Sequence, residues 1–477
     1  MAAPKKLTLF DVTNLVVGAI VGADIYVAAS FGSGLLGPAS LLSWVVAGIF
    51  ATIIALVFAK CSGVVKEAGG PYAYAKEAFG HFSGFITGWA LWLAEVAALC
   101  VFPVAFVTYF SFFFPLEFIG RTIMVLLFVL FLFLTNYFGV KKAARTNDAF
   151  TILKIAPLFL LIIAGFVWIA AHPSMAASNL SPFAPLGFEN FGMATVLIFW
   201  AYVGFELASI PVKDIKNAEK TIPKAIVFGM LIVSVFYILT NFVIISSANY
   251  IQLAGQSAPL TFVALILMGG LGAVIMGIGA MISVSGSDES GLIGTTRLAY
   301  SMAADGYFPK FLGSLHKKYS TPHTSLAVHS LIAFIAAAFL PIKDLITFSV
   351  FTFCFCFIMV SLSALRLRKD LTTKALSLSS IVICFYLISQ SGLSSIVLGL
   401  VMLAIGIPVY FFFAPKTEFS EAKKFLSKED NILKHRIEKE NVFLARLLRH
   451  LKERSRTRKR KVSGEKKNRN SRKKVKD

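Results

Sequence analysis

Two long hydrophobic stretches of this chain are each interrupted by glycine and an acid. The first, residues 11–36, contains Gly18-Ala19-Ile20-Val21-Gly22, and the second, residues 188–212, contains Ala201-Tyr202-Val203-Gly204-Phe205-Glu206. Each stretch is long enough to cross a bilayer, where an unpaired backbone amide costs several kcal/mol. A broken helix therefore survives only where it is buried or lines a cavity. Paired breaks in two halves of a chain indicate a transporter's binding site.

The composition is that of a polytopic membrane protein. Hydrophobic residues make up 57% of the 477, the mean hydropathy is +0.76, and only 15% of residues are charged, against about a quarter in soluble domains. The five cysteines lie in or beside apolar segments, as small packing residues do, although the spacing of Cys354 and Cys356 could also hint at metal or redox chemistry. No histidine completes a ligand set near them, so we expect no metal and no cofactor.

A window of about 20 residues predicts twelve membrane-spanning helices. They lie near residues 11–36, 39–60, 82–110, 121–139, 147–171, 189–212, 223–247, 259–299, 322–341, 344–366, 375–391 and 393–414. We therefore expect an all-α membrane domain over residues 1–415, followed by a separate tail over residues 416–477.

Charge in the predicted loops agrees with this count. If the N-terminus lies inside, the outer loops hold only Arg121 and Lys343, and the inner loops hold the other loop lysines and arginines. Positive charge on the inner side is the usual pattern of membrane proteins. We therefore expect a multi-pass protein of the cell membrane with both termini in the cytoplasm.

Several ionisable residues fall inside the predicted spans, where they are costly and usually functional. They are Asp24, Glu95, Lys154, Glu206, Asp288 and Glu289. Other interpretations stay open: Asp288 and Glu289 could lie at a helix end in water, Asp24 and Glu95 could be paired packing groups, and Lys154 could extend toward the cytoplasmic side.

The tail carries half of the lysines and arginines of the chain. Residues 428–452 have leucine and isoleucine at the spacing of an amphipathic helix, and residues 454–477 are basic and nearly free of apolar side chains. Anionic lipid head groups are the favoured partner. Nucleic acid is not expected, because the segment lacks aromatic residues that would stack on bases. A basic segment that only keeps the tail inside is the alternative.

Four motifs make the chain resemble the amino acid–polyamine–organocation permeases over about residues 5–415. They are Gly18 to Gly22; Glu67-Ala68-Gly69-Gly70-Pro71-Tyr72-Ala73-Tyr74; Phe199 to Glu206 followed by residues 216–225; and residues 297–306 followed by Phe308-Pro309 and Thr321-Pro322. The resemblance implies a leucine-transporter-like core, in which spans one to five and six to ten form inverted repeats. It also implies a substrate held between the broken helices one and six. The chain departs from the family pattern at Asp24 and at Ala218.

Glycine at a break lets the backbone turn away from the helix and approach a ligand closely. Exposed amides at a helix N-terminus favour an anion, so a substrate carboxylate suits residues 19–22, and carbonyls before Gly204 suit an ammonium group. Glycines that serve tight helix packing are the alternative. The candidate binding residues are Ala19, Ile20, Val21, Gly22, Trp200, Ala201, Tyr202, Gly204 and Glu206. Trp200 could act as an aromatic lid or cation–π partner.

The resemblance also suggests roles for charged residues. In proton-coupled relatives a lysine at the place of Lys154 occupies the position of a sodium ion, which implies a role in proton coupling. Asp24 and Glu95 are expected to set charge selectivity.

We therefore expect a secondary transporter of amino acids, coupled to protons. An exchanger of cationic amino acids or polyamines, or a membrane sensor, is the alternative. An enzyme is not expected, because the histidines are scattered.

Overall fold

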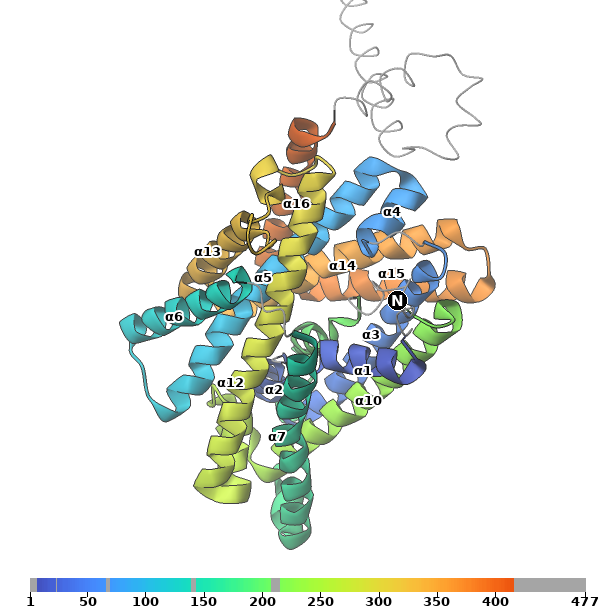
Figure 1. Cartoon of the computed structure of the whole chain (residues 1–477). Coiled ribbons are helices and arrows are strands. Elements are labelled where there is room, and N and C mark those ends of the chain that lie inside the picture. Colours follow the sequence, from blue (N-terminus) through green and yellow to red (C-terminus); the bar gives the residue numbers. More distant parts are fainter. Residues whose placement is uncertain (1–6, 23, 66–68, 139–142, 207–214, 416–477) are drawn as a thin grey trace, which may run out of the picture.

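The computed structural model describes residues 7–22, 24–65, 69–138, 143–206 and 215–415. Within these ranges the regular elements are helices (Figure 1), with one isolated bridge between Leu7 and Ile215. The elements are α1 (Leu9–Ile20), α2 (Asp24–Leu36), η1 (Gly37–Ala39), α3 (Ser40–Ser62), α4 (Pro71–Phe79), α5 (His81–Phe113), α6 (Phe118–Tyr137), α7 (Ala143–Ala171), α8 (Pro173–Asn179), α9 (Phe191–Phe199), η2 (Trp200–Tyr202), α10 (Ala218–Ser247), α11 (Tyr250–Ala254), α12 (Pro259–Ala304), η5 (Lys310–Gly313), α13 (His323–Phe339), α14 (Ile342–Leu367), α15 (Leu371–Gln390) and α16 (Leu393–Phe413).

The helices confirm an all-α polytopic membrane protein. Among the described residues, nine helical segments are long and apolar enough to cross a membrane, and three shorter apolar helices accompany them. The count of twelve spans and the inverted repeat stay predictions. The predicted tail lies outside the described residues.

Local sequence explains where several helices begin. Thr8 and Asp11 form a reciprocal cap at the start of α1, with the Thr8 amide donating to Asp11 at 2.8 Å. Asp370 accepts hydrogen bonds from the Thr373 hydroxyl at 2.8 Å and the Thr373 amide at 3.0 Å, which caps α15. These two bonds hold the pKa of Asp370, which lies at the solvent-exposed start of this helix, below its usual value.

The two halves of the chain pack into one another. Helix α1 lies against α10, α2 against α9, and α3 against both α9 and α10. The long helix α5 packs against α14 and α12. Large aromatic side chains fill the interior, among them Trp44, whose ring centroid lies 5.5 Å from that of Tyr237 and 6.0 Å from that of Tyr202. The first break is therefore surrounded by helices from the second half.

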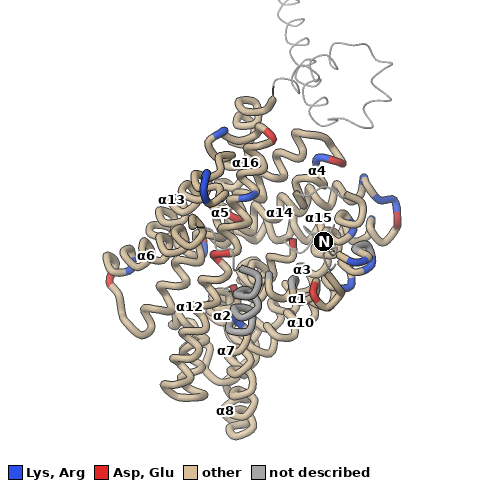
Figure 2. The backbone as a smooth tube through the Cα atoms, viewed as in Figure 1, with Lys and Arg blue, Asp and Glu red and all other residues tan. Residues whose placement is uncertain are grey.

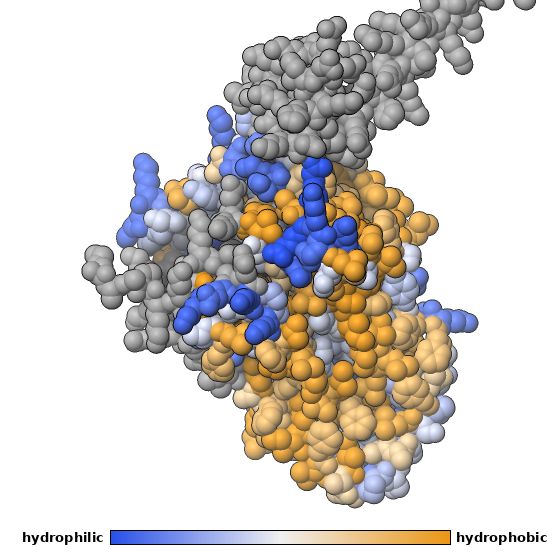
Figure 3. Space-filling view, turned by 90° about the vertical axis from the view of Figure 1, so that its right-hand side faces the viewer, coloured by the Kyte–Doolittle hydropathy of each residue, from blue (hydrophilic) through white to orange (hydrophobic). Residues whose placement is uncertain are grey.

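The outer surface carries a broad apolar face (Figure 3), with hydrophilic side chains gathered at one end. Exposed large hydrophobic residues lie along α6, α7, α10 and α16. Most charged positions lie toward the ends of the helices, and a few acids lie inside the bundle (Figure 2). A surface of this kind fits a lipid environment.

Candidate functional site

The first break lies between α1 and α2. Helix α1 ends at Ile20, Val21 is extended with φ −72° and ψ 97°, and α2 begins at Asp24. The carbonyl of Ile20 stands at the end of α1, and the Tyr237 hydroxyl of α10 donates a hydrogen bond to it at 3.0 Å. The interruption between α1 and α2 is thus stabilised by a side chain from another helix, because buried backbone groups need a hydrogen-bond partner.

Gly22 lies at the closest approach of this break to α12. A β-carbon at Gly22 would collide with the Ser287 hydroxyl and would lie 3.6 Å from Oδ2 of Asp24. A side chain at this position would therefore require the Ser287 hydroxyl to rotate away. The glycine allows close packing against Ser287 of α12. The Asp24 carboxylate also lies close to this position.

The second break follows α9 and the short helix η2. The backbone turns at Gly204, whose φ of +119° is a conformation that residues with a side chain rarely adopt. The Gly204 amide donates to Oε2 of Glu206 at 3.0 Å, so the break is capped by a carboxylate two residues further on. Glu206 is buried, with 3% of its surface exposed. The following residues, 207–214, lie outside the described ranges.

Two aromatic residues of η2 fix its place in the bundle. The Tyr202 hydroxyl donates to the Trp44 carbonyl of α3 at 2.9 Å. The Trp200 ring is buried and lies against Phe102 of α5, with ring centroids 5.9 Å apart. Ala201 between them is fully buried. Trp200 thus faces α5 in the interior of the bundle.

The structure brings the two breaks together. Helix α2 packs against both α9 and η2, and α12 packs against α2. Asp24 and Glu206, one at each break, are buried within electrostatic range of each other. Glu95 of α5, which is half-buried, lies within range of both. Three predicted site acids from three distant segments therefore share one region. Ala19 lies in the last turn of α1.

Lys154 lies on α7, which packs against α12. It is 6% exposed, and its Nζ lies 3.1 Å from the position of a β-carbon on Gly286 of α12. The Tyr26 hydroxyl of α2 lies 3.4 Å from the Lys154 carbonyl. Its ammonium is within electrostatic range of Asp24 and Glu289. Lys154, on α7, is thus buried against α2 and α12.

Sequence reasoning did not find the residues that support the first break. Tyr237 and Ser287 contact it directly, and Tyr109 of α5 donates to the Tyr26 carbonyl at 2.8 Å. A usable signal exists, because a tyrosine in the middle of an apolar span needs a partner for its hydroxyl. Nothing in the local pattern says which backbone carbonyl that partner is.

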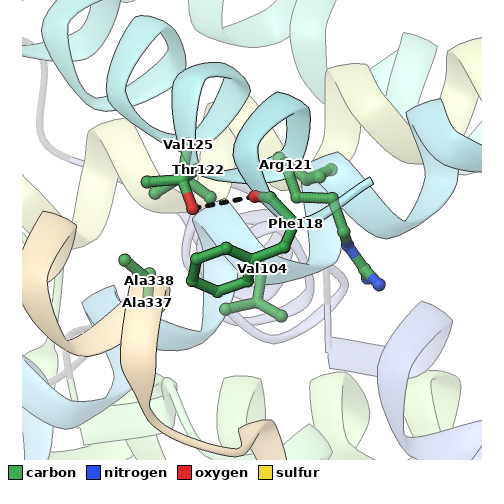
Figure 4. Close-up of a pocket in the computed structure, with 8 residues that line it drawn as sticks. Val104, Phe118, Arg121, Thr122, Val125, Ala337 and Ala338 are labelled. Atoms are coloured by element: carbon green, nitrogen blue, oxygen red, sulfur yellow. Dashed lines mark hydrogen bonds between the residues drawn. The ribbon is translucent and has the colours of Figure 1, made fainter. Parts of the chain in front are cut away.

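A separate cavity of about 190 Å³ lies between α5, α6 and α13 (Figure 4). Thr122 donates to the Phe118 carbonyl at 2.9 Å on its wall, and the Phe118 side chain lies between Val104 and the α13 alanines. None of the predicted binding residues lines it. Its lining consists of Val104, Val107, Phe118, Arg121, Thr122, Val125, Ala337 and Ala338.

Comparison with known proteins agrees with this architecture. A family model described as amino acid permease matches residues 7–425. The branched-chain amino acid permease BcaP of Bacillus subtilis is 28% identical over 442 residues, which cover 86% of this chain and 93% of that protein. The methylthioribose transporter of the same organism is 26% identical, covering 72% of this chain and 76% of its own. The glutamate/serine transporter AimA of Bacillus subtilis is 27% identical, over a match that covers 69% of this chain and 65% of that protein.

Proposed function

The chain belongs to the amino acid permease family, a group of membrane transporters and not of enzymes, and from this premise we propose a specific mode of transport. The protein moves an amino acid or a related amine across the cell membrane as a secondary active transporter. Its termini lie in the cytoplasm. The named substrates of the relatives, branched-chain amino acids, methylthioribose, glutamate and serine, differ widely, so the family alone does not choose among them.

One observation supports the proposal most: two helix breaks from distant segments lie against each other in the interior, each with a buried carboxylate. Non-helical backbone at membrane depth is tolerated only where it is buried in protein or lines a cavity, and paired interruptions of this kind are typical of transporter binding sites. The substrate amino group would lie at the carbonyl end of η2, close to Glu206. Trp200, packed on Phe102, would close the site on the side of α5.

Lys154 is the proposed proton-coupling residue. Its burial between three helices would let a change of charge alter the packing of α2 against α12. A buried ammonium that loses its proton needs less electrostatic compensation, so the two protonation states would favour different conformations. The charged groups that face it are Asp24 from α2 and Glu289 from α12.

Uptake into proteoliposomes tests both parts of this proposal. Purified protein should take up a labelled substrate faster with an inward proton gradient than without one, in sodium-free buffer. Lys154→Ala should remove the difference between initial rates near pH 5 and near pH 8, because its neutral side chain cannot titrate. A strict sodium requirement of the native protein would exclude proton coupling, and pH dependence kept in Lys154→Ala would exclude Lys154.

An exchanger of cationic amino acids or polyamines is the second candidate. It is favoured by the charges of the interior, where Asp24, Glu206 and Asp288 are buried and Lys154 is the buried cation among the described residues. Preloaded vesicles distinguish the two modes: an exchanger releases internal substrate only when external substrate is present. A sensor would bind a ligand and show neither uptake nor exchange.

The tail is proposed to bind anionic lipid through its lysines and arginines, at roughly 1 kcal/mol per basic residue near the surface. Removing the residues after Lys452 should leave uptake in neutral-lipid vesicles unchanged and reduce any stimulation by anionic lipid. Added salt should imitate the truncation through screening. A truncated protein that still responds to anionic lipid would show that the tail is not responsible for that response.

A further inference from the structure

The first turn of α2 already contains a carboxylate of the protein itself. Asp24 is the first residue of this thirteen-residue helix, and it is 8% exposed. The amide end of a helix stabilises an anion, so the position that would best receive a ligand's carboxylate is occupied by a side chain.

The Asp24 carboxylate is directed toward the break. Its Oδ2 lies 3.6 Å from the position of a β-carbon on Gly22, a position that also meets Ser287 of α12. Among the described residues, no lysine or arginine nitrogen lies within 4.0 Å of this carboxylate. An acid that is buried at membrane depth without a close cation is costly, and such an acid is a candidate to receive one from a ligand.

The surroundings add more negative charge than positive. Lys154 attracts Asp24 across the break, whereas Glu206 from the second break repels it. Glu95 of α5 repels both acids. A ligand that brought a further carboxylate to this place would add a like charge to an acidic region. A ligand that brought an ammonium group would meet Asp24 on one side and Glu206 on the other.

We infer that the preferred substrate is a primary amine with no carboxylate beside its amino group, and that Asp24 supplies the carboxylate that an amino acid would bring. This inference rests on the proposed function, because it concerns the substrate of the same break. The ammonium would lie between Asp24 at the start of α2 and Glu206 beyond η2. Lys154 lies against Gly286 of α12, next to Ser287, the residue that Gly22 approaches.

The role of Asp24 has one structural alternative. Asp24 could serve only as the charge partner of Lys154, in which case the substrate could be an ordinary amino acid. The two roles differ in what happens when Asp24 is replaced. A partner of Lys154 affects the pH dependence of transport alike for all substrates, whereas a receptor for the substrate amine changes which substrate is preferred.

Matched pairs of ligands test the inference. Binding to the purified protein is measured for leucine and isoamylamine, and for lysine and cadaverine, where each pair differs by one carboxylate. The native protein should bind the amine of each pair at least about tenfold more tightly. Asp24→Gly should abolish or reverse that preference, because it removes the negative charge and uncovers the amides of α2. Asp24→Asn, which keeps the shape, should weaken the amines in the same direction.

Asp288→Asn is the matched control. Asp288 on α12 is buried to a similar degree, with 4% exposed, and the substitution removes the same charge. It should leave the ratio within each pair unchanged. A native protein that binds and transports leucine or lysine better than the matching amine would overturn the inference and leave the proposed transport function intact. A ratio unchanged in both Asp24 variants would overturn it too. Failure to bind any of the four compounds would overturn the inference, and uptake of another amino acid would then still support the proposed transport function.

Discussion

The two helix breaks look alike in sequence and are stabilised in opposite ways. At the second break the Gly204 amide is capped by Glu206, two residues away in the same segment. At the first break the Ile20 carbonyl depends on Tyr237, which lies 217 residues further along the chain. The turn at Gly204 is therefore capped locally, whereas the end of α1 is supported by a side chain of α10.

This difference has a consequence for transport. A break that is held by another helix changes when that helix moves, and a break that caps itself does not. Lys154, Tyr26 and Tyr109 also gather at the first break, from three helices. We therefore expect the first break to respond to conformational change and protonation, and the second break to act as a rigid wall of the site.

The largest effect is expected at the second break. Gly204→Val should lower the stability of the protein by about 1–3 kcal/mol, because valine must adopt a backbone conformation that its β-carbon disfavours. The thermal midpoint in detergent and uptake should both fall. Gly294→Ala is the control, because a β-carbon there meets open space. Native stability in Gly204→Val would show that this break is not a rigid element.

Glu206→Gln should have a more selective effect. Its side-chain oxygen can still accept the hydrogen bond of the Gly204 amide, so the cap survives and only the charge is lost. The apparent affinity for the substrate should fall about tenfold, because the charge that faces its amino group is lost. Binding affinity and the melting temperature are measured on the same preparation. Native affinity in the folded variant would mean that Glu206 does not contact the amino group.

The smallest effect is expected from two tyrosine hydroxyls, one near each break. Tyr237→Phe removes the hydrogen bond to the Ile20 carbonyl at the end of α1, and the net loss should be about 1 kcal/mol. Tyr202→Phe removes the bond to the Trp44 carbonyl, which lies inside the continuous helix α3 and keeps a helical donor. Uptake should therefore fall more in Tyr237→Phe than in Tyr202→Phe. The reverse order would contradict the dependence of the first break on α10.

The sequence predicts what depends on local composition. Hydropathy places the apolar helices, and glycine beside an acid places both breaks, because these signals lie within one segment. Contacts between segments are not predictable in the same way. Neither the support of Ile20 by Tyr237 nor the approach of Gly22 to Ser287 follows from spacing along the chain. The cavity between α5, α6 and α13 also had no sequence signal, because apolar residues on three helices form it.

The position of Asp24 shows the limit most clearly. The sequence suggests a substrate carboxylate at residues 19–22, and it marks Asp24 as a departure from the family pattern that is expected to set charge selectivity. The structure places the Asp24 carboxylate at the same helix start, buried and directed at Gly22. Whether the Asp24 carboxylate and a substrate carboxylate would occupy the same position depends on distances between atoms, which the sequence does not give.

The most direct test of the central claim, that the first break receives the substrate, is the binding of the best ligand to purified Gly22→Val. A valine there would fill the space in front of α12 without altering the apolar character of the helix. Isothermal titration should show no binding heat for Gly22→Val and native affinity for the control Gly294→Ala. Gel filtration should show that Gly22→Val is folded. Native affinity in folded Gly22→Val would place the substrate elsewhere and contradict the claim.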